Sequence, residues 1–241
     1  MKKIGFYTMF AAALLGCTAL SAADAEEGLV LHLPLNEGEG EVVKDLGPRQ
    51  LTGKVVQPAD TKWVEGRSGG KALEMSGVNG KAPYIEVRGF KPDDFTRGMT
   101  VMCYFKPDKE KYVRKAVWQL VCDGTRANFL MAVHYQRLIF GNDNKFTKHA
   151  VSNNSKNPIR GGEWIHLAAT HDGQTFKVYI DGALAGVGGE NMSGPIAPGR
   201  GTLAIGSRFG WGPAFGVFSD VKLYTRALSD AEIMNAASGE N

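Results

Sequence analysis

The sequence predicts an all-β fold, a sandwich or jelly roll of antiparallel strands that ends in one short helix. Three observations support this prediction. Apolar and polar residues alternate with period two through most of the chain after residue 28, as in strands with one buried face. The 31 glycines against 10 prolines indicate many turns. The 241 residues are enough for a large domain with a real hydrophobic core.

The strands are expected to be short and closely spaced. The first apolar run covers residues 29–35, and clear alternation returns at residues 84–87. Further runs suited to strands occupy residues 100–105, 116–121, 129–134 and 137–140. Many short strands followed by a single helix favour a sandwich over a helical or mixed fold.

Residues 163–187 predict a meander of three antiparallel strands. Asp172-Gly173 and Asp181-Gly182 separate three alternating runs. Asp-Gly between such runs is a strong hairpin signal, because glycine adopts the positive φ that the turn needs. Four large apolar residues are predicted to enter the core where they face inward: Trp164, Leu167, Val178 and Ile180.

The one helix is predicted to begin after Ser229. Ser229 and Glu232 have the spacing of a capping box, in which each side chain bonds the backbone amide of the other residue. Ile233 and Met234 supply apolar contacts, and Gly239 is a helix stop.

The first residues have the pattern of a secretory signal. Lys2 and Lys3 precede an uncharged and mostly apolar stretch, and small residues surround Ala23. We therefore expect residues 1–23 to be a removed signal peptide, residues 24–28 a short tail, and residues 29–241 one domain.

A second export route is also open. Leu14-Leu15-Gly16-Cys17 resembles a bacterial lipobox, in which Cys17 would carry a lipid anchor. The predicted location is secreted, periplasmic or at the cell surface, with the lipoprotein as the alternative.

Charge and hydropathy exclude two classes of protein. Without Lys2 and Lys3 the 28 basic residues become 26 against 25 acidic ones, a net charge of +1. A nucleic-acid-binding protein usually has a clustered positive excess, so no nucleic-acid partner is expected. No later apolar run approaches the roughly 18 residues of a membrane span, so no transmembrane segment is expected in the mature chain.

Two cysteines remain outside the leader. Cys103 and Cys122 each lie in a predicted strand, and these strands are candidates for hairpin neighbours. Export permits a disulfide between them. The alternative is two separately buried thiols that act as small hydrophobic residues.

Several segments resemble bacterial laminin-G-like domains of the concanavalin A-like lectin/glucanase superfamily. Residues 162–168 (GEWIHLA) are similar to the family pattern G-x-W-x-H-V-A, and residues 179–182 (YIDG) to Y-V-D-G. Other matching segments follow the family's order, at residues 66–75, 100–107, 203–206 and 220–229. The resemblance implies two antiparallel sheets packed face to face as a concanavalin A-like jelly roll.

The resemblance also implies a possible calcium ion. Asp45 stands where many relatives have D-x-S-G, and Asp220 lies on the last strand, so the two carboxylates are the candidate ligands. The family's paired acids before that strand are Ser219 and Asp220 here, with one acid kept. The alternative is that Asp45 caps a turn before Gly47 and that Asp220 ends an exposed loop.

Two acidic or serine motifs suggest catalysis, and each is better explained as a turn. Residues 66–70 (GRSGG) satisfy G-x-S-x-G, but a strand pattern follows where a nucleophile elbow needs a helix. Glu37, Glu39 and Glu41 alternate with glycines after the first strand, unlike the acid cluster of the superfamily's glucanases.

The histidines also give little indication of a catalytic or metal-binding site. The five histidines have no metal-ligand spacing on one element, and His32 and His166 alternate within strands, which favours structural roles. His134, Tyr135 and Arg137 have residue types that jelly-roll polysaccharide lyases use. Tyr135-Gln136 more simply forms a tight turn between strands.

The predicted ligand site is the glycine-rich segment of residues 206–216. It carries three aromatic residues and an arginine among glycines and a proline, which argues for a surface loop. An exposed aromatic ring suits stacking on a sugar, and arginine suits hydroxyls or a carboxylate. Trp211, Arg208 and Phe209 are the predicted ligand contacts, whereas Phe215 is expected to fold back onto the sandwich.

These observations favour a non-catalytic, lectin-like module that binds a glycan or polysaccharide. This functional prediction rests on analogy with the fold. A polysaccharide lyase or hydrolase of the same fold and a cell-surface adhesion domain are the alternatives.

Overall fold

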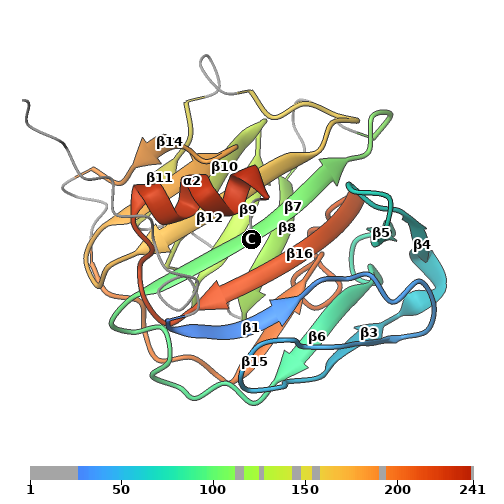
Figure 1. Cartoon of the computed structure of the whole chain (residues 1–241), viewed down its shortest axis with the longest axis horizontal. Coiled ribbons are helices and arrows are strands. Elements are labelled where there is room, and N and C mark those ends of the chain that lie inside the picture. The colour runs from blue at the N-terminus through green and yellow to red at the C-terminus, as the bar shows by residue number, and fades with distance from the viewer. Residues whose placement is uncertain are drawn as a thin grey trace, which may run out of the picture.

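The structure, a computed structural model, is a sandwich of two antiparallel sheets with eight strands each (Figure 1). It describes residues 27–111, 117–124, 128–142, 148–153, 158–189 and 194–239. The predicted all-β jelly roll with one C-terminal helix is confirmed. The predicted signal peptide (residues 1–23) and Cys17 lie outside the described residues.

The first sheet is built around two long strands, β7 (Met99–Pro107) and β16 (Gly216–Tyr224). From β7 outward the order continues through β12 (Ile165–His171), β13 (Phe176–Ile180) and β14 (Ala183–Val187). On the other side of β16 lie β5 (Lys71–Met75), β4 (Thr61–Glu65) and β1 (Leu29–Leu33). β5 pairs with the beginning of β16 and β1 with its end.

The second sheet has the order β11-β10-β9-β8-β15-β6-β3-β2. Its strands are β11 (His149–Val151), β10 (Arg137–Gly141), β9 (Leu130–His134), β8 (Val117–Asp123), β15 (Thr202–Ile205), β6 (Tyr84–Arg88), β3 (Gly53–Val56) and β2 (Val42–Val43). A 3-10 turn, η1 (Pro58–Asp60), leads from β3 into β4.

The hydrophobic core lies between the two sheets. At its centre Phe105 packs on Phe218 with ring centroids 4.7 Å apart. Leu167, Val178 and Ile180 are buried in this core, which confirms the predicted strand phase of the meander. Trp164 precedes β12 and is only partly buried, so its predicted place in the core is wrong.

The edges of the two sheets meet where β14 approaches β11. The amide of Asn153 donates to the carbonyl of Ala185 at 3.0 Å. A Cβ placed on Gly186 would lie 2.1 Å from the Val151 carbonyl oxygen. Only glycine allows the backbones to come this close.

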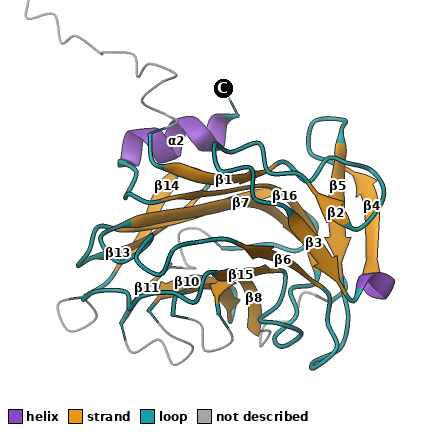
Figure 2. Ribbon diagram, turned by 90° about the horizontal axis from the view of Figure 1, so that it is seen from below, coloured by secondary structure: helices purple, strands orange, loops and turns teal. Residues whose placement is uncertain are grey.

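Helix α2 (Asp230–Ser238) covers the outer face of the first sheet (Figure 2). The predicted capping box is present: the Ser229 amide donates to Glu232 at 2.7 Å, and the Glu232 amide to the Ser229 hydroxyl at 3.3 Å. Ile233 is fully buried against the sheet. At the other end, the Tyr104 hydroxyl donates to the Ala237 carbonyl at 2.8 Å. Local sequence and packing therefore agree on the helix bounds.

The two cysteines are separate buried thiols. Cys103 lies in β7 and faces the core, whereas Cys122 lies in β8 and faces the outer side of the other sheet. The expectation that their strands are hairpin neighbours is wrong, because the chain crosses between the sheets after β7. Burial raises the pKa of each thiol to about 12, so neither is a reactive thiolate.

Most of the predicted strands are present, and five observed strands were not predicted as strands. These five are residues 42–43, 53–56, 61–65, 149–151 and 202–205. Each has at most five residues, and three lie at the ends of the sheets, where alternation is weakly imposed. Residues 66–70 form a turn before β5, as expected. Within the described residues, no helix has the length and apolar character needed to cross a bilayer.

Candidate ligand-binding site

The predicted ligand segment forms a tight hairpin between β15 and β16. The Arg208 amide donates to the Trp211 carbonyl at 2.8 Å, and the Trp211 amide to the Arg208 carbonyl at 3.1 Å. Between them Phe209 and Gly210 have φ values of 50° and 92°. Two positive φ angles at the centre of a two-residue loop define a type I′ turn.

The turn is held against the loop that joins β5 to β6. The Gly210 carbonyl accepts hydrogen bonds from the amides of Gly80 at 2.7 Å and Ala82 at 3.3 Å. The Ser207 hydroxyl accepts from the Gly210 amide at 3.0 Å and donates to the Pro83 carbonyl at 3.1 Å. These bonds fix the position of the turn relative to the second sheet.

A second set of bonds holds the residue after the turn. The Gly212 amide donates to Asn79 Oδ1 at 2.7 Å, and the Gly212 carbonyl accepts from the Gln119 amide at 2.9 Å. A Cβ on Gly212 would come within 2.6 Å of the Gln119 side chain. Glycine at this position therefore lets the loop lie flat on β8.

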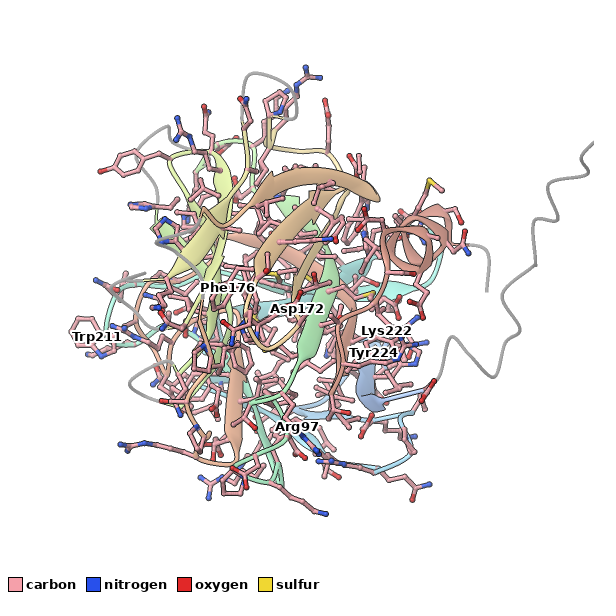
Figure 3. The ribbon with its side chains drawn as sticks, turned by 90° about the vertical axis from the view of Figure 1, so that its left-hand side faces the viewer. Arg97, Asp172, Phe176, Trp211, Lys222 and Tyr224 are labelled. Atoms are coloured by element: carbon pink, nitrogen blue, oxygen red, sulfur yellow. The ribbon has the colours of Figure 1, made fainter. Side chains whose placement is uncertain are left out.

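Trp211 projects from this rigid frame into solvent. Trp211 is 53% exposed. One part of the indole lies beside Gly80, where an added Cβ would be 3.5 Å from the ring. In Figure 3 the side chain stands at the outer margin of the molecule, on the side away from the helix. The predicted surface position of Trp211 is thus what the structure shows.

The other two aromatic rings of the segment pack on the protein. Phe209 lies edge-on to Tyr84, with centroids 5.3 Å apart, on the outer face of the second sheet. Phe215 packs against Trp118 and the main core, as expected. Phe209 therefore anchors the turn and, like Arg208, is only partly exposed, so Trp211 is the most exposed of the three predicted ligand contacts.

Asp45 caps a turn, as the alternative to the calcium prediction supposed. Its Oδ1 accepts from the amides of His32 and Gly47, both at 2.7 Å, and its Oδ2 accepts from the Leu51 amide at 2.7 Å. Both carboxylate oxygens are thus directed at N–H donors.

Asp220 contacts one imidazole and one ammonium group. Its carboxylate is 2.6 Å from His32 Nε2 and 3.4 Å from Lys222 Nζ. It has a φ of 50° at a bulge in β16. Burial alone would raise the pKa of Asp220, but the hydrogen bond with His32 and the charge of Lys222 hold it below its ordinary value.

These donor sets do not fit a calcium site. Calcium needs six to eight oxygen ligands, whereas the partners of Asp45 and Asp220 are amides, an imidazole and an ammonium. Among the described residues no group of three or more His, Cys, Asp or Glu is arranged to hold a metal ion. Asp45 and Asp220 both contact His32, at its amide and at its Nε2 respectively, and calcium binding stays an untested prediction.

The sequence did not predict the shifted pKa values of two side chains: Asp123, which was not singled out, and His166, for which only a structural role in a strand was expected. His166 is 2% exposed, its Nδ1 has no hydrogen-bond partner among the described residues, and burial lowers its pKa to about 4. Asp123 is 4% exposed, and burial raises its pKa to about 6. No local signal identifies either group, because their burial comes from segments distant in sequence.

The comparisons with known proteins identify the family. Residues 79–234 match the laminin-G-type family model described as the concanavalin A-like lectin/glucanases superfamily. This is more than half of the chain, so the chain belongs to that superfamily. The match includes both segments that build the Trp211 turn.

Solved structures of similar fold include known binding domains. Domain 4 of AbnA, a GH43 extracellular arabinanase from Geobacillus stearothermophilus, was solved in complex with arabinotriose. It has a TM-score of 0.64 and 18% identity, over 87% of this chain and 98% of that chain. The binding domain of botulinum neurotoxin DC in complex with SialylT has a TM-score of 0.66 and 12% identity, over 89% of this chain and 52% of that chain. At these identities the likeness shows the fold alone.

A curated relative matches one short segment. Human pappalysin-1 is 46% identical over 37 residues, which are 15% of this chain and 2% of that protein. The chain therefore spans a very small part of this relative.

Proposed function

We propose that this protein is an exported, non-catalytic carbohydrate-binding module that stacks a sugar ring on Trp211. The observation that carries the proposal is that Trp211 is 53% exposed on a turn held by hydrogen bonds on both sides. A ring already fixed in place loses little conformational freedom when a ligand binds. Sugars present C–H faces that bury apolar surface against such a ring.

The expected contribution of the indole suits weak glycan binding. Burying half of an indole removes enough apolar area to contribute roughly 1–2 kcal/mol at about 25 cal/mol per Å². A change of about 1.4 kcal/mol alters affinity tenfold. One exposed tryptophan therefore suffices to decide whether a polysaccharide is retained.

Other features support binding rather than catalysis. Glu37, Glu39 and Glu41 lie on an irregular loop and not on an inner strand. Tyr135 and Gln136 have φ values of 52° and 66° in the turn between β9 and β10, as a hairpin requires. Similar folds include domains solved with arabinotriose and with SialylT, which agrees with a glycan ligand.

Affinity electrophoresis through gels that contain soluble polysaccharides tests the proposal. Wild-type protein is expected to be retarded by at least one polysaccharide without release of reducing sugar. Trp211→Ala is expected to migrate as in a gel without polysaccharide and to keep the wild-type melting temperature.

Tyr135→Ala is the matched control, because Tyr135 is also about half exposed and lies on a tight two-residue turn. It is expected to stay retarded. Equal retardation of wild type and Trp211→Ala would overturn the role of Trp211. Release of product would favour a lyase or hydrolase, and no retardation on any glycan would favour an adhesion domain.

A further inference from the structure

The side chains of Arg208 and Trp211 leave the turn on the same side. The two residues exchange both backbone hydrogen bonds, at 2.8 and 3.1 Å. Residues opposed in this way have Cα atoms about 5.5 Å apart and present their side chains to one face of the ribbon. That spacing is comparable to the width of one pyranose ring, so a single sugar residue can contact both side chains.

Arg208 has no acidic partner in the described part of the chain, unlike several other arginines. Arg49 pairs with Asp94, Arg88 with Glu86, and Arg226 with Glu232. Arg208 is only partly exposed, and its charge lies close enough to act on the thiol of Cys122. Its guanidinium thus lies near Cys122 on the outer face of the second sheet, and no carboxylate among the described residues forms an ion pair with it.

The two segments that hold the turn carry basic residues and no acidic ones, and Glu86, which follows the first segment, is paired with Arg88. The two tethered segments, residues 76–85 and 203–218, contain Lys81 and Arg208 and no aspartate or glutamate. Lys81 is exposed and lies one residue from Gly80, which contacts the indole. A ligand on Trp211 therefore meets two cations and no acidic residue from these segments.

We infer that the site selects acidic glycans, in which the guanidinium of Arg208 binds a carboxylate on the sugar that stacks on Trp211. This inference rests on the proposed function and names its ligand class. Guanidinium and carboxylate form two parallel N–H···O bonds, which fix orientation as well as adding affinity. Lys81 adds a longer-range attraction that weakens as salt increases.

Matched ligands test the charge of the glycan separately from stacking. Polygalacturonate and sialyllactose are each compared with their own methyl esters, which have the same sugar rings and no free carboxylate. Binding is measured at two salt concentrations for wild type, Arg208→Gln, Arg208→Lys and Trp211→Ala. Arg88→Gln is the charge-matched control, since Arg88 lies on the same sheet and pairs with Glu86.

Wild type is expected to bind at least one carboxylated ligand about tenfold more tightly than its neutral partner. Arg208→Gln should lose the preference for the carboxylated ligand and keep the wild-type affinity for the neutral ligand. Arg208→Lys should keep part of the preference. Trp211→Ala should weaken both members of a pair, and Arg88→Gln should change neither.

Equal binding of both members through Trp211 would overturn the inference and leave the proposed function intact. If Trp211→Ala instead binds both members of a pair as tightly as wild type does, the proposed function is overturned. Dextran sulfate provides a last control. If it binds as tightly as the carboxylated ligands and Arg208→Gln has no effect, the attraction is general ion exchange and the inference fails.

Discussion

Two buried groups should make the stability of this protein respond to acid in opposite directions. Asp123 lies at the end of β8, and a Cβ on Gly199 would come within 2.5 Å of its Oδ2. Burial raises the pKa of Asp123 from 3.8 to about 6, although the backbone and charge of Arg200 oppose the change. Because folding raises the pKa of this carboxyl, its protonated form stabilises the fold. This stabilisation is fully present below pH 3.8 and is lost as the pH rises through about 6.

His166 has the opposite sign. Burial lowers the pKa of its imidazole from 6.5 to about 4. The folded protein favours the neutral ring, so the contribution of His166 to the free energy of unfolding is fully present above pH 6.5. It is lost as the pH falls through about 4, because the unfolded chain then binds a proton that the folded chain excludes.

Each of these two pKa shifts corresponds to a change of about 3 kcal/mol in the free energy of unfolding, at about 1.4 kcal/mol for each pKa unit. Both side chains are less than a tenth exposed, so solvent screening reduces this figure little. Between pH 4 and pH 6.5 the two contributions are of similar size and opposite sign, so we expect them to offset each other in the wild type. Removing one group should therefore reveal the slope of the other.

Urea unfolding at constant ionic strength, repeated from pH 7 to pH 4, measures both slopes. Relative to wild type, Asp123→Asn is expected to lose about 3 kcal/mol of unfolding free energy over that range. His166→Leu is expected to gain a similar amount relative to wild type. The readout is the slope, so a constant loss of stability in either variant does not affect it. Profiles parallel to wild type in both variants would refute the reasoning.

Three further predictions concern packing and processing. Ile180→Ala should cost on the order of 2–5 kcal/mol through lost burial and a cavity, and an unchanged melting temperature would show that Ile180 does not face the core. Gly186→Ala should lower the melting temperature by several degrees, because its Cβ would strike the Val151 carbonyl; Ala185→Gly, one residue away, is the control. Intact mass of exported protein should match loss of residues 1–23, whereas a diacylglycerol adduct on Cys17 would show the lipoprotein route.

Local features of this molecule could be predicted because they depend on neighbouring residues. The capping box of Ser229 and Glu232 needs only their spacing of three residues. The Asp181-Gly182 turn needs only two residues that tolerate positive φ, and both have it, at 49° and 78°. Trp211 could be placed on the surface for a similar reason, since the glycines around it exclude a packed strand.

Relations between distant segments required the tertiary structure. Cys103 and Cys122 lie in successive long strands, yet the chain places them in different sheets, which no spacing in the sequence reveals. Phe209 and Trp211 both lie among glycines in the same segment. Tyr84 from another strand packs on Phe209, which is partly buried, whereas Trp211 is 53% exposed.

The same reason explains the altered side-chain chemistry. Asp45 was predicted as a calcium ligand because of its place in the family pattern. The structure shows that the loop brings three amides to its carboxylate. The pKa values of His166 and Asp123 depend on burial by segments far away in the chain. Burial and long-range hydrogen bonds are properties of the folded chain, so residue type and spacing predict the elements of this protein better than the chemistry of its individual side chains.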